Sequence, residues 1–184
     1  MTNPSVHRPQ PSLLCHVHSS LSHRAHAPCP RLVLRVRQGA LELDPHDHEL
    51  HYGFASAIEE LGFKREARES YLAAERLYPL CPKPHLALGA LLMGAGRTRA
   101  ALRRFERALF LCPDPKDDDA WTAAVNAGNC GLRLAKAHPS HAAALLPQAV
   151  RRLERALQGA NEANRPAIEG LLRQACELAS AVPV

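Results

Sequence analysis

Histidine and cysteine side chains occur in two groups whose chemistry would allow them to bind a metal ion. His46, His48 and His51 lie together in the segment HDHELH, and His48 and His51 would share one face of a helix. A second and looser group consists of Cys81, His85 and Cys112. Zinc sites generally use tighter ligand pairs, such as C-x2-C or H-x3-H. A metal site is therefore an alternative interpretation, and the simpler expectation is that the thiols pack as small apolar groups.

Arginine side chains recur on two later segments, where they could attract phosphate or carboxylate groups. They are Arg97, Arg99, Arg103, Arg104, Arg107, Arg151, Arg152 and Arg155. Glu106 and Glu154 lie among them, so a solvated and partly balanced face is the simplest interpretation. Binding of RNA or of an acidic protein surface by these arginine stripes stays an alternative. The segment GAGRTR at 94–99 is a poor phosphate loop, because it follows a predicted helix rather than a strand.

No set of residues in the sequence has the arrangement of a catalytic site. Neither a Ser/His/Asp nor a Cys/His arrangement occurs at a spacing typical of a nucleophilic enzyme. Paired carboxylates in a context that suggests a cleft are also absent from the sequence. We therefore expect a protein that is not an enzyme and that needs no cofactor.

The composition favours helices and argues against a nucleic-acid partner. Apolar residues make up 46% of the 184 positions but aromatic residues only 4%, so the apolar mass is mainly alanine and leucine. Such residues suit closely packed helices better than strands. The net charge of +5 arises in residues 1–41, which contain five arginines and no acidic residue. The other 18 of the 23 basic residues equal the 18 acidic ones, so the rest of the chain has no charge excess for binding phosphates.

Residues 1–30 are rich in proline and histidine and lack a periodic apolar pattern, which predicts a disordered leader. The leader contains arginine and serine but no acidic residue, as organelle transit peptides do. An unstructured tail and a targeting segment both stay open. The sequence has no apolar run long enough to cross a bilayer, and its six cysteines form no C-x2-C pair. We therefore expect a cytoplasmic protein with free thiols, or an imported one if the leader is a transit peptide.

Beyond the leader, segments with helical apolar spacing alternate with proline and glycine. The expected helices span residues 47–61, 64–78, 82–95, 98–111, 117–137, 141–158 and 163–180, after a shorter helical segment at 31–44. The joints between them are short, so consecutive helices must pack antiparallel. The expected fold class is all-α.

Two stretches of the sequence match each other at a constant step of about 34 residues. Ala67, Tyr71, Ala74, Leu77 and Pro79 recur as Ala101, Phe105, Ala108, Leu111 and Pro113, and His51, Phe54, Ala55, Ile58 and Gly62 recur as His85, Leu88, Gly89, Leu92 and Gly96. The small residues allow two helix backbones to approach closely, and the aromatic residues fill the space between neighbouring helix pairs. Glycine suits a left-handed residue after the first helix, and proline stops the second helix.

These matched positions resemble the tetratricopeptide repeat (TPR), a helix–turn–helix unit that stacks into a superhelix. The resemblance implies antiparallel helix pairs in a short right-handed superhelix with a C-terminal capping helix. It divides the chain into a disordered leader at 1–30, a partial repeat helix at 31–46, two repeats at 47–81 and 82–115, a degenerate repeat with an insertion at 116–159, and a capping helix and tail at 160–184.

The resemblance also implies that the first helix of each pair lines a concave groove, which receives a peptide or a helix of a partner protein. The groove residues would be Glu49, Tyr52, Ser56, Glu59, Leu86, Ala87, Ala90, Met93, Thr122, Asn126 and Asn129. Their apolar middle, with carboxylates at one end and amides at the other, predicts a partner of apolar and basic character.

One branch of the TPR family binds the C-terminal carboxylates of Hsp70 and Hsp90 with cationic and amide side chains. The corresponding positions in this sequence are Tyr52, Ser56, Ala87, Asp119 and Ala123. None of these side chains can form such a clamp, so we expect no binding of this kind.

The sequence as a whole favours a protein-interaction scaffold or adaptor that presents a preformed concave surface. A first alternative is a fragment of a larger TPR protein, in which the repeats would serve a catalytic or membrane domain. A second alternative is a helical repeat that binds RNA through the arginine stripes.

Overall fold

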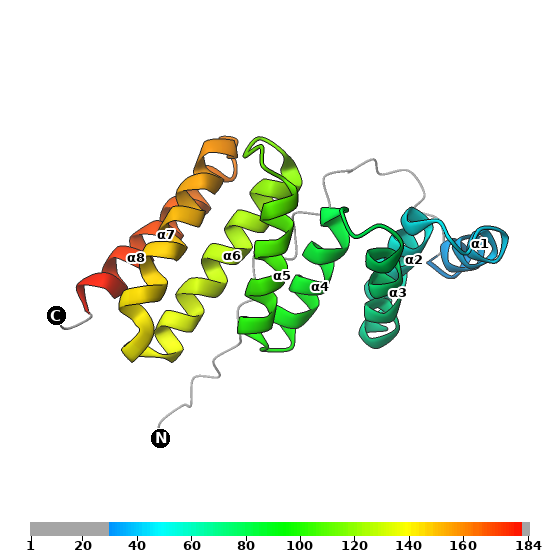
Figure 1. The fold of residues 1–184 in the computed structure, drawn as a ribbon, viewed down its shortest axis with the longest axis horizontal. Helices are drawn as coiled ribbons and strands as arrows, with labels where there is room; N and C mark the ends of the chain where they lie inside the picture. The colour runs from blue at the N-terminus through cyan, green and yellow to red at the C-terminus, as the bar shows by residue number, and fades with distance from the viewer. Residues whose placement is uncertain (1–29, 182–184) are drawn as a thin grey trace, which may run out of the picture.

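The computed structural model describes residues 30–181, so nearly all of the predicted leader lies outside the described residues. Within this range the chain forms eight α-helices, one short 3-10 helix and no strand (Figure 1). The elements are α1 (Pro30–Leu43), α2 (His48–Glu60), α3 (Lys64–Leu77), α4 (Pro82–Gly94), α5 (Thr98–Leu111), α6 (Asp118–Ala137), η2 (Pro139–His141), α7 (Ala142–Gly159) and α8 (Arg165–Ser180). The fold class is all-α, as predicted.

The helices begin and end close to the predicted positions, and no end differs by more than two residues. Aspartates mark two of the starts. Asp47 accepts hydrogen bonds from the backbone N–H groups of Glu49 at 2.7 Å and Leu50 at 3.3 Å. Asp117 accepts one from Asp119 at 2.8 Å. These side chains satisfy backbone donors that have no partner within the helix, which fixes where α2 and α6 begin.

Two glycines turn the chain between the helices of the two regular pairs. Gly62 follows α2 with a φ angle of 90°, and Gly96 follows α4 with a φ angle of 74°. Both angles lie in the left-handed region, which other residues enter only at a cost. The predicted role of both glycines is confirmed, and the tight turns make each helix pair antiparallel.

The helices stack side by side in chain order along the long axis of the molecule (Figure 1). α2 packs on α3, α4 on α5, and α6 on α7. Contacts of α3 with α4 and of α5 with α6 join one pair to the next. α1 packs against α2 at one end of the described stack, and α8 packs against α7 and α6 at the other. The arrangement is an α-helical solenoid, in which each pair buries the apolar face of its neighbour.

Three clusters of buried side chains follow one another along the stack. Their large members include Tyr71 in the first cluster, Phe105 in the second and Leu153 in the third. The alanines at the repeat positions are completely buried, namely Ala55, Ala67, Ala74, Ala101 and Ala108. A Cβ atom on Gly89 would lie 2.6 Å from the Phe105 ring, so only glycine allows α4 to approach α5 this closely.

The third helix pair is longer but keeps the same packing. α6 has 20 residues against 13 in α4, and η2 connects α6 to α7. Ala149, Leu153 and Ala156 are completely buried and keep the mutual spacing of Ala101, Phe105 and Ala108, although they follow them by more than one repeat length. A Cβ atom on Gly128 would lie 2.6 Å from Leu153, so the pairing of a glycine with a large side chain recurs. The added residues therefore lengthen the pair without opening its core.

Candidate functional site

The first helices of the three pairs, α2, α4 and α6, carry the residues predicted to contact a partner, and we call this set the first-helix surface. It consists of Glu49, Tyr52, Ser56, Glu59, Leu86, Ala87, Ala90, Met93, Thr122, Asn126 and Asn129. Glu49 and Ala90 are exposed, and Leu86 and Asn126 are buried. The others are half-buried. Part of this surface is therefore accessible to solvent.

Two apolar members of the first-helix surface pack inside the protein. Leu86 is only 6% exposed and belongs to the cluster around Phe105. Met93 packs against the same cluster, and the Cys130 thiol lies 3.9 Å from its sulfur atom, at the length of a weak hydrogen bond. Leu86 is thus a core residue, since α4 turns this side chain toward α5 and α6. The apolar middle of the first-helix surface is smaller than the sequence indicates.

Tyr52 lies at the edge between the first-helix surface and the core. Its ring centroid is 5.4 Å from that of Tyr71. Burial and the negative charge of Asp119 raise the pKa of Tyr52 to about 12, so its hydroxyl group stays protonated at neutral pH.

The two carboxylates of α2 have different environments. The hydroxyl group of Tyr71 donates a hydrogen bond to Oε2 of Glu59 at 2.8 Å. Burial and the charge of Glu59 also raise the pKa of Tyr71 well above its usual value. Glu59 is therefore held by the core, whereas Glu49 is exposed. Of the two carboxylates, Glu49 is the one that a basic partner could reach without disturbing the core.

Asn126 is a buried polar residue in the middle of the first-helix surface. It lies on α6 and is 8% exposed. No residue of the described chain forms a hydrogen bond with its side-chain oxygen Oδ1. Buried polar atoms are nearly always hydrogen-bonded, and an unsatisfied one costs about 1–3 kcal/mol.

The histidines considered as metal ligands are placed apart and make other contacts. The ring of His48 packs against that of Tyr78, with centroids 4.9 Å apart. His51 donates a hydrogen bond from Nε2 to the carbonyl oxygen of Pro45 at 2.9 Å. Between residues 30 and 181, no three His, Cys, Asp or Glu side chains come close enough to hold a metal ion.

The cysteines Cys81, Cys112, Cys130 and Cys176 are all free thiols. Cys112 and Cys130 are buried, and burial raises the pKa of each to about 11. Both thiols are therefore protonated at neutral pH and unreactive as nucleophiles. They act as small apolar groups in the core, as the sequence predicts.

Several arginines of the predicted stripes hold the second helices together. Nη1 of Arg104 lies 2.6 Å from the Glu75 carboxylate, which joins α5 to α3. Arg152 forms an ion pair with Glu106, which joins α7 to α5. Each of the two arginines follows a completely buried alanine by three residues, so they occupy equivalent repeat positions. This shared spacing could have shown from the sequence that the two arginines have the same structural role. Their acidic partners could not be found in this way, because Glu75 and Glu106 lie on other helices and at different repeat positions.

Two further arginines of the stripes also have contacts within the protein. Nη2 of Arg155 donates hydrogen bonds to the carbonyl oxygens of Cys112 at 3.0 Å and Pro113 at 2.8 Å. The guanidinium group of Arg107 lies 5.3 Å from the centre of the Phe110 ring. These contacts anchor α7 to the loop before α6 and cover part of an exposed aromatic ring.

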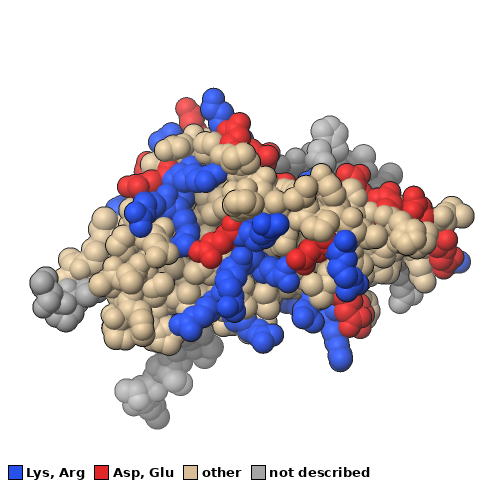
Figure 2. Space-filling view, viewed as in Figure 1, with Lys and Arg blue, Asp and Glu red and all other residues tan. Residues whose placement is uncertain are grey.

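Arg97, Arg99 and Arg103 differ from the arginines just described, because none of their side chains forms an ion pair, a hydrogen bond or a ring contact with a described residue. They line a pocket of about 440 Å³ at the start of α5. Figure 2 shows bands of basic side chains over the middle of the molecule, with acidic side chains between them. Ion pairs neutralise part of the positive charge of the second helices. The charges of the three arginines in this pocket are not neutralised by a described residue.

Comparisons with known proteins support the repeat architecture. No family model and no curated protein matches the sequence. Among solved structures, YrrB, described as a TPR protein with an unusual peptide-binding site, is 19% identical with a TM-score of 0.56, over 81% of this chain and 77% of its own. PilF of Pseudomonas aeruginosa is 17% identical with a TM-score of 0.59, over 84% and 77% of the two chains. MamA of Desulfovibrio magneticus is 15% identical with a TM-score of 0.56, over 84% and 88%.

Proposed function

We propose that this chain, which has the tetratricopeptide-repeat fold, is a protein-interaction scaffold without catalytic activity of its own. A peptide or helix of the partner would lie across the first-helix surface of α2, α4 and α6. Stacked helical repeats are rigid enough to present such a surface before the partner arrives, which lowers the entropy cost of binding. YrrB, which has the same fold, is described with a peptide-binding site.

The observation that carries this proposal is a polar row on α6, in which the partly accessible Thr122 and Asn129 flank the buried Asn126. Thr122 and Asn129 lie four residues before and three residues after Asn126, so all three share one face of α6. Thr122 and Asn129 are half-buried, whereas most other residues of α6 are fully buried against neighbouring helices. A polar row of this kind suits the N–H and C=O groups of a peptide backbone, which the side chains of Thr122 and Asn129 could contact.

The chemistry of the neighbouring helices indicates the character of the partner. Ala90 is exposed on α4, where its small side chain leaves room for an apolar group of the partner. Glu49 is exposed on α2 and would attract a basic group. The partner segment would therefore be apolar where it crosses α4 and basic where it reaches α2.

Cytoplasmic location is part of the same proposal. The buried thiols of Cys112 and Cys130 are unpaired, as is usual in a reducing compartment. None of the helices between residues 30 and 181 is both long and apolar enough to cross a membrane.

The test is a quantitative pull-down with the full chain, followed by mass spectrometry of the retained proteins. Ala90→Arg should block the first-helix surface and reduce retention of specific partners at least tenfold, a change of about 1.4 kcal/mol. Glu49→Lys should weaken the same partners by removing attraction to their basic groups. Both changes are at exposed positions, so we expect the fold to survive.

Two matched controls distinguish surface contact from general effects. Ala144→Arg introduces the same group at an exposed alanine of α7. Glu66→Lys reverses an exposed charge in the first turn of α3, as Glu49→Lys does in the first turn of α2. Both controls should retain the partners at wild-type levels. Retention of every specific partner by Ala90→Arg and Glu49→Lys as well would show that the first-helix surface is not the binding site.

A further inference from the structure

A second candidate site lies between the start of α5 and the end of α6. The turn at Gly96 and the first turns of α5 form one side of the pocket, and Leu134, Ala137 and His138 form the other. Its volume of about 440 Å³ is within the range of ligand-binding pockets. None of its lining residues belongs to the first-helix surface, so this site is separate from the one proposed above.

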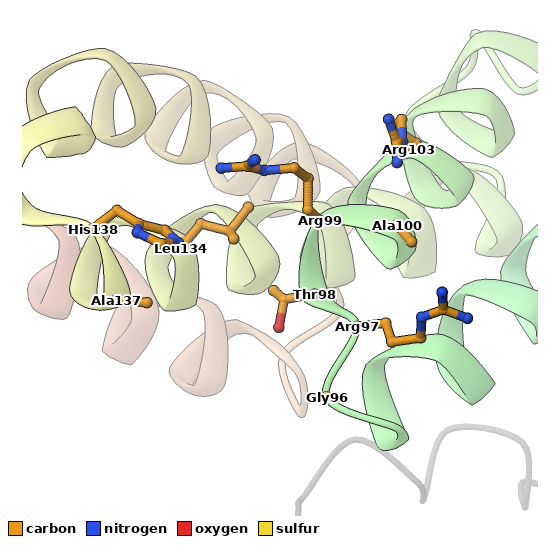
Figure 3. A pocket seen from close by; sticks show the side chains of 9 residues that line it. All are labelled: Gly96, Arg97, Thr98, Arg99, Ala100, Arg103, Leu134, Ala137 and His138. Atoms are coloured by element: carbon orange, nitrogen blue, oxygen red, sulfur yellow. The ribbon is translucent and has the colours of Figure 1, made fainter.

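The cationic side chains of the pocket stand on two sides of an apolar strip (Figure 3). Arg99 reaches from α5 toward Leu134 and His138 of α6. Arg103 extends on the same side of α5 as Arg99, and Arg97 lies on the other side of Ala100. Ala100 and Leu134 give the pocket an apolar surface beside these arginines, and Thr98 adds a hydroxyl group to the lining. The pocket can therefore accept two negative groups with an apolar group between them.

The charges at this pocket are uncompensated by the described part of the protein. Further along α5, Arg104 pairs with Glu75. By contrast, Arg97, Arg99 and Arg103 have no acidic partner between residues 30 and 181. The N-terminus of α5 adds its own partial positive charge, and no side chain caps it. Three like charges and a helix N-terminus repel one another, and a bound anion would relieve this repulsion.

We propose that this pocket binds an acidic peptide segment of a partner protein, in which carboxylates flank an apolar side chain. One carboxylate would pair with Arg99 or Arg103, and another with Arg97. The apolar side chain would lie over Ala100 and Leu134. Guanidinium groups suit this role, because their planar fork donates two parallel hydrogen bonds to one carboxylate. The chain would then have two binding surfaces of opposite preference, the first-helix surface for basic segments and this pocket for acidic ones.

A nucleic acid fits the pocket less well than an acidic peptide. Single-stranded nucleic acid requires a continuous basic track and aromatic rings on which bases stack. Three arginines come together in this pocket, and its lining contains no Phe, Tyr or Trp on which a base could stack. Glu154 is exposed on α7 and would repel a phosphate backbone that reached it.

The experiment measures binding of a fluorescein-labelled peptide, Gly-Ser-Asp-Asp-Leu-Asp-Asp-Ser-Gly, to the full chain by fluorescence polarisation. We expect binding that weakens as salt is added, since exposed charges are screened. The amide peptide, with Asn in place of every Asp, should not bind. The double variant Arg99→Gln/Arg103→Gln should lose at least tenfold in affinity, a change of about 1.4 kcal/mol. Both arginines are exposed and glutamine has a similar helix propensity, so circular dichroism should show an intact fold.

The matched control is Arg65→Gln/Arg68→Gln in the first turns of α3. It removes two exposed charges, and Arg65 is the equivalent of Arg99 in the preceding repeat. This variant should bind the acidic peptide as the wild type does. The proposal is overturned by equal loss in this control, by undiminished binding to the α5 variant, or by equal binding of the amide peptide. It is also overturned if oligouridylate RNA binds more tightly than the acidic peptide, or if the peptide does not bind at about 1 mM in low salt.

Discussion

At the scale of single residues, the two regular repeats fill the same space with different chemistry. Tyr71 and Phe105 occupy equivalent positions, and so do Glu59 and Met93, because each pair is separated by one repeat length. In the first repeat the Tyr71 hydroxyl donates its hydrogen bond to Glu59. In the second repeat Met93 packs against the cluster of Phe105, and neither side chain has a polar group that needs a partner. In both repeats, therefore, the two side chains leave no polar group of the pair without a partner.

We predict that exchanging these residues singly is costly. Tyr71→Phe should lower the free energy of unfolding by about 1 kcal/mol, because Glu59 loses its hydrogen bond. Phe105→Tyr should lower it by about 2 kcal/mol or more, because a hydroxyl would be buried beside Gly89 with no acceptor. The double variant Glu59→Met/Tyr71→Phe copies the second repeat and should cost less than the sum of its single changes. Urea denaturation of these three variants and of the single variant Glu59→Met measures the four changes in the free energy of unfolding. A Phe105→Tyr variant as stable as the wild type would contradict the prediction.

At the scale of helices and turns, the positions of two glycines determine how each pair folds back on itself. Gly96 has a left-handed backbone, whereas Gly94, two residues earlier, is the last residue of α4. A Cβ atom at either position would meet nothing within 4 Å. The two glycines therefore differ in backbone conformation and not in the space around them, which makes them a matched pair for testing the turn.

We predict opposite effects of alanine at these two positions. Gly96→Ala should destabilise the protein by about 1–2 kcal/mol, because alanine must adopt a positive φ angle. Gly94→Ala should leave stability unchanged or raise it by up to about 1 kcal/mol, because alanine favours the helix. Thermal or urea denaturation of the two variants under identical conditions measures the difference. Equal stability of both would mean that the turn can relax to a right-handed conformation.

At the scale of the whole molecule, the stack has a well-supported middle and a weakly supported end. α6 contacts α4, α5, α7 and α8, whereas α1 packs mainly against α2. On α1, Val36 is 64% exposed and Leu43 is 89% exposed. In a solenoid each unit is stabilised by its neighbours, so local stability should follow the number of neighbours.

We predict that hydrogen exchange will be fastest in α1 and slowest in α6, among the helices between residues 30 and 181. Opening α1 exposes little apolar surface, whereas opening α6 exposes two of the three core clusters. Exchange followed by mass spectrometry of peptides from both helices measures this order. Protection of α1 equal to that of α6 would show that the stack unfolds as a single cooperative unit.

The sequence predicts the fold better than the site for a physical reason. Helix ends are marked locally, by residues such as Gly62, Asp47 and Asp117, and local signals can be read without knowing what lies next to them. The burial of Leu86 depends on two other helices, and the partners of Arg104 and Arg152 lie on a different second helix. Such contacts form only after the pairs have stacked. The sequence therefore predicts where α4 begins and ends more accurately than which of its side chains are buried.

The length of α6 has a consequence for how such a protein can change. α6 has 20 residues, about 30 Å, and α5 has 14, about 21 Å, and the last turns of α6 lie beside the first turns of α5. Leu134 and Ala137 belong to these last turns and form one wall of the basic pocket. A helix of the length of α4 would end before both residues and leave that wall missing. In evolutionary terms, a small insertion in one repeat can supply a new recognition site in a single mutational event, while the residues that stack the repeats stay as they were.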